Sequence, residues 1–324
     1  MPTMTDVLRA ARLLEGRLPP TPTWEYPALS EAAGCALHVK HENVQPVGAF
    51  KVRGGLNLLA GLDPEQRHLG VVTCSTGNHA QSMAYAARLA AVPCRVVMPA
   101  GANEAKVRAT RALDAEVVLH GATLEDAAAH AADLARRHRA RLVSPGDEPA
   151  LIAGVATAYL ELFGAVPDLD AVVVPVGSGT GAAAACLVAR ALAPGCEVIA
   201  VQSTDSPAAH DSWRAGLCLD RPNRTTVEGL ATGRAFELPQ KILRDVLTDF
   251  VLVADAAIHR AQALLVSHAH TLAEGAGAAA LAAVLARPRR FAGRSVAVVC
   301  TGGNIGPHEL ATLTAGTAAS AGPA

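Results

Sequence analysis

The first feature of this sequence that could do chemistry is a lysine set among glycines. Lys51 lies in the run PVGAFKVRGG, which spans residues 46–55 and places Phe50 directly before the lysine. A lysine becomes a nucleophile when burial or a nearby cation lowers its pKa, and its amine can then form a Schiff base with an aldehyde. The alternative is an ordinary surface lysine at the start of a helix. The run alone favours that alternative, because most short motif matches are accidental.

A second run, CSTGNHAQ at residues 74–81, lies between an apolar stretch and a helical pattern. Backbone N–H groups at the start of a helix carry partial positive charge and lack partners within the helix, so they bind carboxylates. Helix capping would explain one polar side chain in this turn, but the turn holds several. The candidate carboxylate site comprises Ser75, Thr76, Gly77, Asn78 and His79.

A third run, VGSGTG at residues 176–181, again joins an apolar strand to an alanine-rich helix, which is typical of a phosphate site. The candidate phosphate site comprises Gly177, Ser178, Gly179, Thr180 and Gly181. The same run also fits the dinucleotide fingerprint G-x-G-x-x-A, which needs an acidic residue after the next strand to hold the ribose. That strand ends in Gln202, so a single phosphate monoester fits better.

Together with AEGAG at residues 273–277 and CTGGN at residues 300–304, these runs resemble the fold type II pyridoxal-phosphate enzymes. The order of the runs is closest to the threonine/serine dehydratase (ammonia-lyase) branch. The resemblance implies an α/β fold of two domains, with parallel-type twisted sheets flanked by helices, as in the tryptophan synthase beta-like architecture. It also implies pyridoxal 5'-phosphate as cofactor and a homodimer as the usual assembly.

The resemblance further implies roles for individual residues. Lys51 would carry the cofactor as a Schiff base, and the turn at residues 75–79 would hold the substrate carboxylate. Thr76 would be the second candidate catalytic residue, since a hydroxyl there could work from the opposite face of the cofactor. The remaining cofactor contacts would be made by Phe50, Asn78, Gly177, Ser178, Gly179, Thr180, Gly181, Glu274 and Thr301.

The implied reaction is α,β-elimination from a β-hydroxy amino acid, L-threonine or L-serine above all, to a 2-oxo acid and ammonia. Lys51 would act as the base that removes the Cα proton. An amino-acid racemase, a β-replacement synthase and a non-catalytic amino-acid-binding regulator stay open as alternatives.

Several positions depart from the family pattern. Thr301 stands where serine is more frequent, and Val155 and Ala156 stand where the family has Gln-Gly. Gln202 stands where some relatives bind a divalent cation through a glutamate, and an amide is a poor ligand for such a cation. We therefore expect no metal.

Composition indicates an ordinary enzyme. The chain has 324 residues, of which 51% are hydrophobic and 3% aromatic, and a net charge of −1. A charge near zero argues against nucleic acid or an anionic membrane as partner, and no apolar run is long enough to span a bilayer. The N-terminus lacks a signal-peptide pattern, and the seven cysteines lack close pairs, so we expect reduced thiols and a cytoplasmic location.

Apolar runs alternate with helical patterns along the chain, which predicts parallel sheets with helical crossovers. We expect a small inserted domain at residues 47–149 and a large cofactor-binding domain formed by residues 1–46 and 150–324. Residues 312–324 are expected to form a frayed tail. The expected strands lie at residues 36–42, 70–74, 94–98, 116–119, 141–144, 171–176, 197–202, 250–253 and 295–299.

Overall fold

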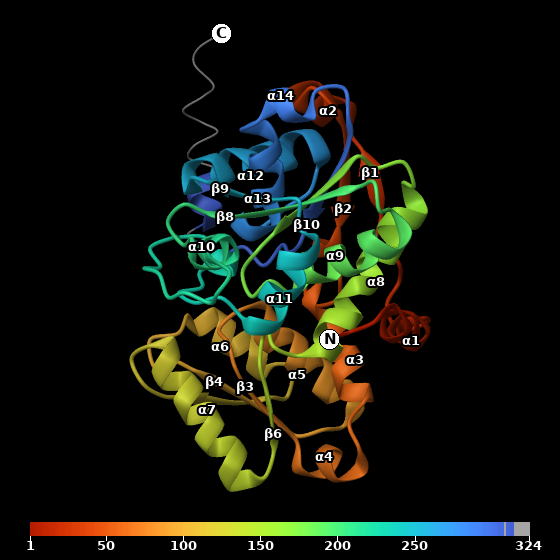
Figure 1. Ribbon diagram of the computed structural model, residues 1–324. Helices are drawn as coiled ribbons and strands as arrows, with labels where there is room; N and C mark the ends of the chain where they lie inside the picture. Colours follow the sequence, from red (N-terminus) through yellow and green to blue (C-terminus); the bar gives the residue numbers. More distant parts are fainter. Residues whose placement is uncertain (308, 314–324) are drawn as a thin grey trace. The chain divides into compact units, whose positions relative to one another are not determined.

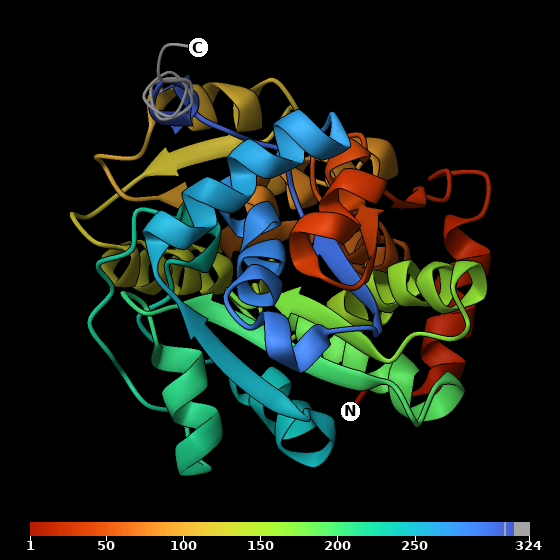
Figure 2. The ribbon, with the colours of Figure 1, turned by 90° about the horizontal axis from the view of Figure 1, so that it is seen from above.

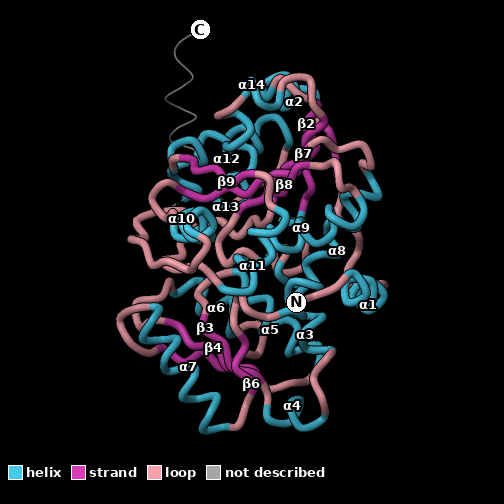
Figure 3. The backbone as a smooth tube through the Cα atoms, viewed as in Figure 1, coloured by secondary structure: helices cyan, strands magenta, loops and turns pink. Residues whose placement is uncertain are grey.

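The computed structural model describes residues 1–307 and 309–313, in which helices and strands alternate along the chain (Figure 1). The chain divides into two compact units. Unit 1 comprises Met1–Pro19 and Gln45–Thr157, and unit 2 comprises Pro20–Val44 and the described residues from Ala158 onward. The strands form two separate sheets, drawn in magenta in Figure 3.

Unit 1 is built on a four-stranded parallel sheet in the order β5-β4-β3-β6. Its strands are β3 (Val71–Cys74), β4 (Cys94–Met98), β5 (Glu116–Leu119) and β6 (Arg141–Val143). Its helices are α1 (Met4–Leu14), α3 (Lys51–Ala60), α4 (Pro64–Leu69), α5 (Asn78–Ala90), α6 (Glu104–Arg111), α7 (Leu124–His138) and the first part of α8 (Pro149–Ala165).

Side chains of successive strand residues in unit 1 point to opposite faces, and each face has its own core. Val71 and Val96 pack in one buried cluster with residues of α3, α5 and α6. Val72 and Val97 pack in another, formed with alanines of α7. Both faces are therefore covered by helices, as parallel sheets require.

Unit 2 is built on a six-stranded sheet in the order β1-β2-β10-β7-β8-β9. All its pairs are parallel except β1 with β2. Its strands are β1 (Thr23–Glu25), β2 (Ala36–His41), β7 (Ala171–Pro175), β8 (Glu197–Ser203), β9 (Asp249–Val253) and β10 (Ser295–Cys300). Its helical elements are α2 (Pro27–Ala33), η1 (Glu42–Val44), the rest of α8, α9 (Thr180–Leu192), α10 (Ala208–Ala215), η2 (Glu228–Leu230), α11 (Glu237–Val246), α12 (Asp255–Ala269), α13 (Gly275–Leu285) and α14 (Pro288–Phe291).

Helix α13 is the centre of the unit 2 core. Its residues up to Val284 are all buried, because the segment consists of Gly, Ala, Leu and Val and has no polar face. It lies with α12 on one side of the sheet, as the blue ribbons in Figure 2 show, and packs with alternate strand residues such as Val173 and Val298. Helix α9 packs on β7 and β8 from the other side.

The α/β fold class is confirmed, and each of the nine expected strands is present within one or two residues at either end. Strand β1 was not expected. It has three residues, pairs antiparallel at the edge of the sheet, and leaves Trp24 56% exposed, so it gives no buried apolar run.

The domain boundaries expected at 46/47 and 149/150 stay a prediction. The compact units group Met1–Pro19 with unit 1, because α1 packs against α3. The expected frayed tail lies outside the described residues from position 314 onward. No helix of the described chain is both long and apolar enough to cross a membrane.

Candidate active site

Lys51 is the first residue of α3, and Phe50 is the residue that precedes this helix. The lysine side chain is partly buried, and Nζ lies 5.5 Å from the centroid of the Phe50 ring. Burial lowers the pKa of Lys51 from 10.5 to about 8, since an ammonium loses hydration in the protein interior. More of this amine is therefore neutral, and so nucleophilic, near neutral pH than for an exposed lysine.

The start of α3 is packed closely on its neighbours through glycines. A Cβ atom on Gly54 would lie 2.9 Å from the carbonyl oxygen of Leu151, and one on Gly154 would lie 2.5 Å from the carbonyl oxygen of Arg53. These two glycines bring the backbones of α3 and α8 into direct contact. The guanidinium of Arg53, which is 1% exposed, donates to Thr157 Oγ1 at 3.1 Å and fastens the same two helices. The position of Lys51 is thus determined by packing rather than by a loop.

The candidate carboxylate turn connects β3 to α5. Ser75 N donates to Val97 O at 3.3 Å, and Ser75 Oγ accepts from Gly77 N at 3.2 Å. Asn78 is the first residue of α5, so the turn at residues 75–77 stands directly before a helix N-terminus. Such a terminus favours an anion through its backbone N–H groups and the helix dipole.

His79 is buried, and burial together with the charge of Lys51 lowers its pKa from 6.5 to about 3. The imidazole is therefore neutral at physiological pH. Its Nε2 lies 2.9 Å from Thr73 Oγ1, and that hydroxyl donates its single proton to Val143 O at 2.8 Å. Thr73 must then accept from His79, which assigns the imidazole proton to Nε2 and leaves Nδ1 as an acceptor. In this form the imidazole proton of His79 is used within the protein, and the expected role of His79 in carboxylate binding stays a prediction.

The candidate phosphate turn connects β7 to α9 in unit 2. Gly179 precedes α9 with a φ of 88°, a conformation that favours glycine. A Cβ atom on Gly177 would lie 2.2 Å from the carbonyl oxygen of Gly229, so only glycine fits there. Thr180 and Gly181 begin the helix, and Ser178 Oγ lies 3.5 Å from Thr180 Oγ1. A glycine turn at a helix N-terminus is the cradle that a phosphate monoester requires.

Glu274 and Thr301 lie on two segments of unit 2 that pack directly on each other. Glu274 precedes α13, and its backbone N–H donates to Gly302 O at 3.1 Å. A Cβ atom on Gly277 would lie 2.4 Å from the same carbonyl oxygen. The turn after β10, which begins with buried Thr301, is therefore held against the first turn of α13.

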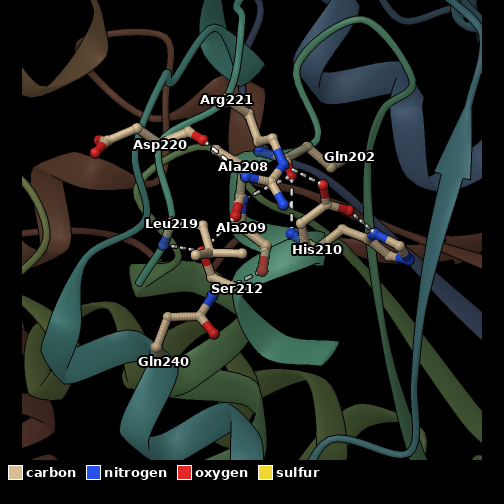
Figure 4. Close-up of polar contacts among 10 residues, drawn as sticks. Gln202, Ala208, Ala209, His210, Ser212, Leu219, Asp220, Arg221 and Gln240 are labelled. Atoms are coloured by element: carbon tan, nitrogen blue, oxygen red, sulfur yellow. Dashed lines mark hydrogen bonds and ion pairs between the residues drawn. The ribbon is translucent and has the colours of Figure 1, made fainter. Parts of the chain in front are cut away.

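Gln202 is fully buried at the end of β8 and uses its amide within the protein. Its Oε1 accepts from the backbone N–H groups of Ala209 and His210, at 3.1 and 3.2 Å (Figure 4). Its Nε2 donates to Thr232 Oγ1 at 3.4 Å. The amide thus connects the first turn of α10 to the loop that follows. Within residues 1–307 and 309–313, no three His, Cys, Asp or Glu residues come together in a way that could hold a metal ion.

The structure thus brings the expected residues together in two sets. Unit 1 carries the lysine and the carboxylate turn, with Phe50 beside the lysine. Unit 2 carries the glycine turn, Glu274 and Thr301. Two supporting residues were not expected: Thr73, which determines the imidazole tautomer, and Gly229, which closes against Gly177. Neither residue lies in one of the five motif runs of the sequence.

Comparison with known proteins gives consistent findings. Residues 14–302 match the family model described as pyridoxal-phosphate dependent enzyme. The chain is 33% identical over 318 residues to the L-threo-3-hydroxyaspartate ammonia-lyase of Saccharomyces cerevisiae, which covers 98% of this chain and 97% of that protein. It is 35% identical to the L-threonine ammonia-lyase of Thermotoga maritima, over 94% of this chain and 76% of that protein. Among solved structures, serine racemase from Dictyostelium discoideum matches with a TM-score of 0.88 and 32% identity, over 94% of this chain and 99% of that one.

Proposed function

This chain belongs to the pyridoxal-phosphate dependent enzymes, and from this premise we propose that it is an ammonia-lyase. The reaction converts a β-hydroxy amino acid into a 2-oxo acid and ammonia. The observation that carries the proposal is the lysine amine at the start of α3, with a pKa lowered to about 8, in the same unit as the candidate carboxylate turn at a helix N-terminus.

The residues present fit pyridoxal 5'-phosphate. Lys51 would hold its aldehyde carbon as a Schiff base, with Phe50 and Asn78 as neighbouring contacts. The glycine turn from Gly177 to Gly181, which admits no side chain at its first position, would bind its phosphate. Glu274 and Thr301 would lie at its ring. When bound, this cofactor supplies an electron sink for negative charge at the substrate Cα.

A neutral hydroxyl at Thr301 does not keep the ring nitrogen protonated as a carboxylate would, which suits elimination better than transamination.

The protein's own groups would then bind the substrate and move its proton. The hydroxyls of Ser75 and Thr76, with the start of α5, would bind the substrate carboxylate. The amine of Lys51, in its neutral form, would take the Cα proton. Neutral His79 would keep the turn in place through Thr73. Elimination releases the β-hydroxyl of the substrate as one molecule of water, and the later hydrolysis that releases ammonia consumes one molecule of water. The net products are therefore the 2-oxo acid and ammonia.

We further propose that the substrate carries an uncharged β-substituent, as L-threonine and L-serine do. A substrate with a second carboxylate, such as the one named for the yeast relative, would add a second negative charge to a site whose turn would already bind the α-carboxylate. The carboxylate turn at residues 75–79 contains no lysine or arginine, and its histidine is neutral.

The test is to incubate the holoenzyme with L-threonine, L-serine and L-threo-3-hydroxyaspartate while 2-oxo acid and ammonia are measured. Borohydride reduction followed by peptide mass spectrometry locates the cofactor. We expect turnover of the first two substrates and a reduced adduct on Lys51. An adduct at another residue, or no adduct, would refute the proposal, and turnover of hydroxyaspartate alone would refute the substrate choice.

Racemisation is a second candidate, favoured by the hydroxyl of Thr76 and by the likeness to the structure of Dictyostelium discoideum serine racemase. If Thr76 is the second acid/base group, Thr76→Ala should abolish racemisation of L-serine and spare elimination. Equal loss of both activities would count against that role.

We also propose that the enzyme is a cytoplasmic homodimer. The seven cysteines, all within the described residues, are free thiols, which is consistent with a reducing compartment. Light scattering coupled to size-exclusion chromatography measures the assembly, and a monomer mass would contradict the dimer.

A further inference from the structure

A serine outside the expected sites bonds directly to the backbone of Lys51. Ser82 lies on α5 and is 1% exposed, and its Oγ donates to Lys51 O at 2.5 Å. A serine inside a helix commonly turns back to a carbonyl of its own helix or faces water. Here the hydroxyl crosses to the first turn of a different helix.

The contact depends on a glycine in α3. A Cβ atom on Gly55 would lie 2.5 Å from Ser82 Oγ and 2.8 Å from Ser82 O. Any side chain at position 55 would therefore push α5 away from α3 and lengthen the bond to Lys51. Gly55 and Ser82 form a matched pair, in which the missing side chain of one makes room for the hydroxyl of the other.

The bond joins the two elements that carry the unit 1 half of the candidate site. Lys51 begins α3, and because a carbonyl oxygen has two lone pairs, Lys51 O can accept from Ser82 Oγ in addition to the helical bond from residue 55. Ser82 lies three residues after His79, so the two side chains share a face of α5.

We propose that Ser82 is a positioning residue for Lys51: its hydroxyl fastens the first turn of α3 to α5, so that the backbone that carries the amine keeps its place against α5. The inference rests on the proposed role of Lys51. Without the bond, the first turn of α3 would still pack on α8 through Gly54 and Arg53 but would no longer be fastened to α5, so the backbone of Lys51 could shift away from α5. Water would then reach the amine, and its basicity would move toward that of an exposed lysine.

The test measures Lys51 in the apo-protein, without cofactor or substrate. Competitive acetylation with trace acetic anhydride across a range of pH, followed by peptide mass spectrometry, gives the titration midpoint of each lysine. The exposed amine of Lys241 serves as internal reference. We expect a midpoint near 8 for Lys51 in the wild-type protein and a higher midpoint in Ser82→Ala and in Gly55→Ala. A rise of half a unit lowers the Lys51 labelling rate at neutral pH about threefold.

Each variant has a matched control. Thr110→Val removes another buried hydroxyl of unit 1, whose bond goes to Lys106 O within its own helix. Gly61→Ala adds a methyl group at the other end of α3, where the nearest atom lies 3.6 Å away. Neither control should move the Lys51 midpoint, even if it changes the melting temperature.

Two outcomes overturn the inference. The first is a Lys51 midpoint that is the same in Ser82→Ala, Gly55→Ala and the wild-type protein. The second is an equal shift in the controls, which would indicate general loosening. Because the measurement needs no cofactor, failure of the ammonia-lyase proposal leaves it unaffected, and failure of this test leaves that proposal standing.

Discussion

At the scale of single residues, the chemistry depends on the proton of Lys51. Its pKa is lowered from 10.5 to about 8, so the neutral amine increases as pH rises and predominates above about 8. We expect the rate at which the apo-protein takes up pyridoxal 5'-phosphate to rise with pH and to level off above that value. Stopped-flow absorbance measures the rate, and Lys51→Ala should give no stable adduct at any pH. A midpoint near 10.5 would show that water solvates the amine fully.

The glycine turn supports a second prediction for a single residue. In Gly177→Ala the added methyl would lie 2.2 Å from Gly229 O, so the turn would have to move. We expect the dissociation constant for pyridoxal 5'-phosphate to rise at least about tenfold, the equivalent of about 1.4 kcal/mol. Fluorescence titration measures it. Gly195→Ala, where a Cβ atom meets nothing within 4 Å, is the control. Equal affinities in the two variants would contradict a close-fitting cradle.

The sequence indicated the lysine and both turns because their motifs are local. It could not indicate the state of His79, which depends on Thr73 and Val143. The bond from Thr73 to Val143 joins strands 70 residues apart, and neither residue belongs to a motif. Long-range hydrogen bonds of this kind decide which proton a side chain holds, and they become visible only in the fold.

At the scale of elements, we expect a glycine-to-alanine substitution in helix α8 to have opposite effects on the free energy of unfolding at two positions. In Gly154→Ala the new methyl meets Arg53 O at 2.5 Å, whereas in Gly164→Ala it meets nothing within 4 Å. Overpacking should lower the free energy of unfolding by about 1–3 kcal/mol in the first variant. Loss of glycine flexibility should raise it by about 0.5–1 kcal/mol in the second. Urea unfolding measures both, and changes of the same sign would show that the packing of α3 on α8 is not tight.

The first residue of α12, Asp255, fastens a loop of unit 2. Its carboxylate accepts from Ser203 Oγ at 2.5 Å, from Thr225 Oγ1 at 2.8 Å and from Thr226 N at 2.8 Å. Burial alone would raise the pKa of Asp255, but these hydrogen bonds outweigh it and hold the pKa below 3.8. A depressed carboxyl pKa stabilises the fold above the unfolded value, and this stability is lost as pH falls through the folded pKa.

We therefore expect Asp255→Asn to be less stable than the wild-type protein at neutral pH by about 1–2 kcal/mol. The difference should shrink as pH falls below 3.8, where the wild-type carboxylate takes up its proton. Unfolding by urea at several pH values measures the difference. If the difference in free energy of unfolding between the two proteins stays constant with pH, the charge of Asp255 does not contribute to stability.

Among the elements, the buried parallel strands were predictable because each is a continuous apolar run, such as β7, in which every residue is buried. Strand β1 was not, because three residues at a sheet edge give no such run. The irregular loop between α10 and α11 was not predictable either. Its course depends on side chains from other elements, among them Asp255 and Gln202.

At the scale of the whole molecule, cofactor binding should stabilise the protein, since a ligand that binds only the folded state adds free energy by mass action. With free pyridoxal 5'-phosphate at a hundred times its dissociation constant, the gain is about 2.7 kcal/mol. We expect the melting temperature to rise with cofactor concentration in the wild-type protein and to rise less in Gly177→Ala. Scanning calorimetry measures the melting temperature, and a melting temperature that does not change with cofactor concentration would contradict a specific site.

Most of the molecule's architecture was predictable, because the ordered motifs span the greater part of the chain and match the family model over residues 14–302. The grouping of the first residues with unit 1 was not, because helix α1 carries no motif and its place depends on packing against α3.

The order of strands in unit 2 has a consequence for biosynthesis. Strand β2 pairs with β10, which begins only at Ser295, whereas the sheet of unit 1 is complete once Val143 has been made. At ribosomal speeds of about 5–20 residues per second, roughly 13–50 seconds pass between the synthesis of β2 and that of its parallel neighbour β10. The unit that carries Lys51 can therefore fold while translation continues, and the unpaired edge of β2 is where the nascent chain most needs protection by chaperones.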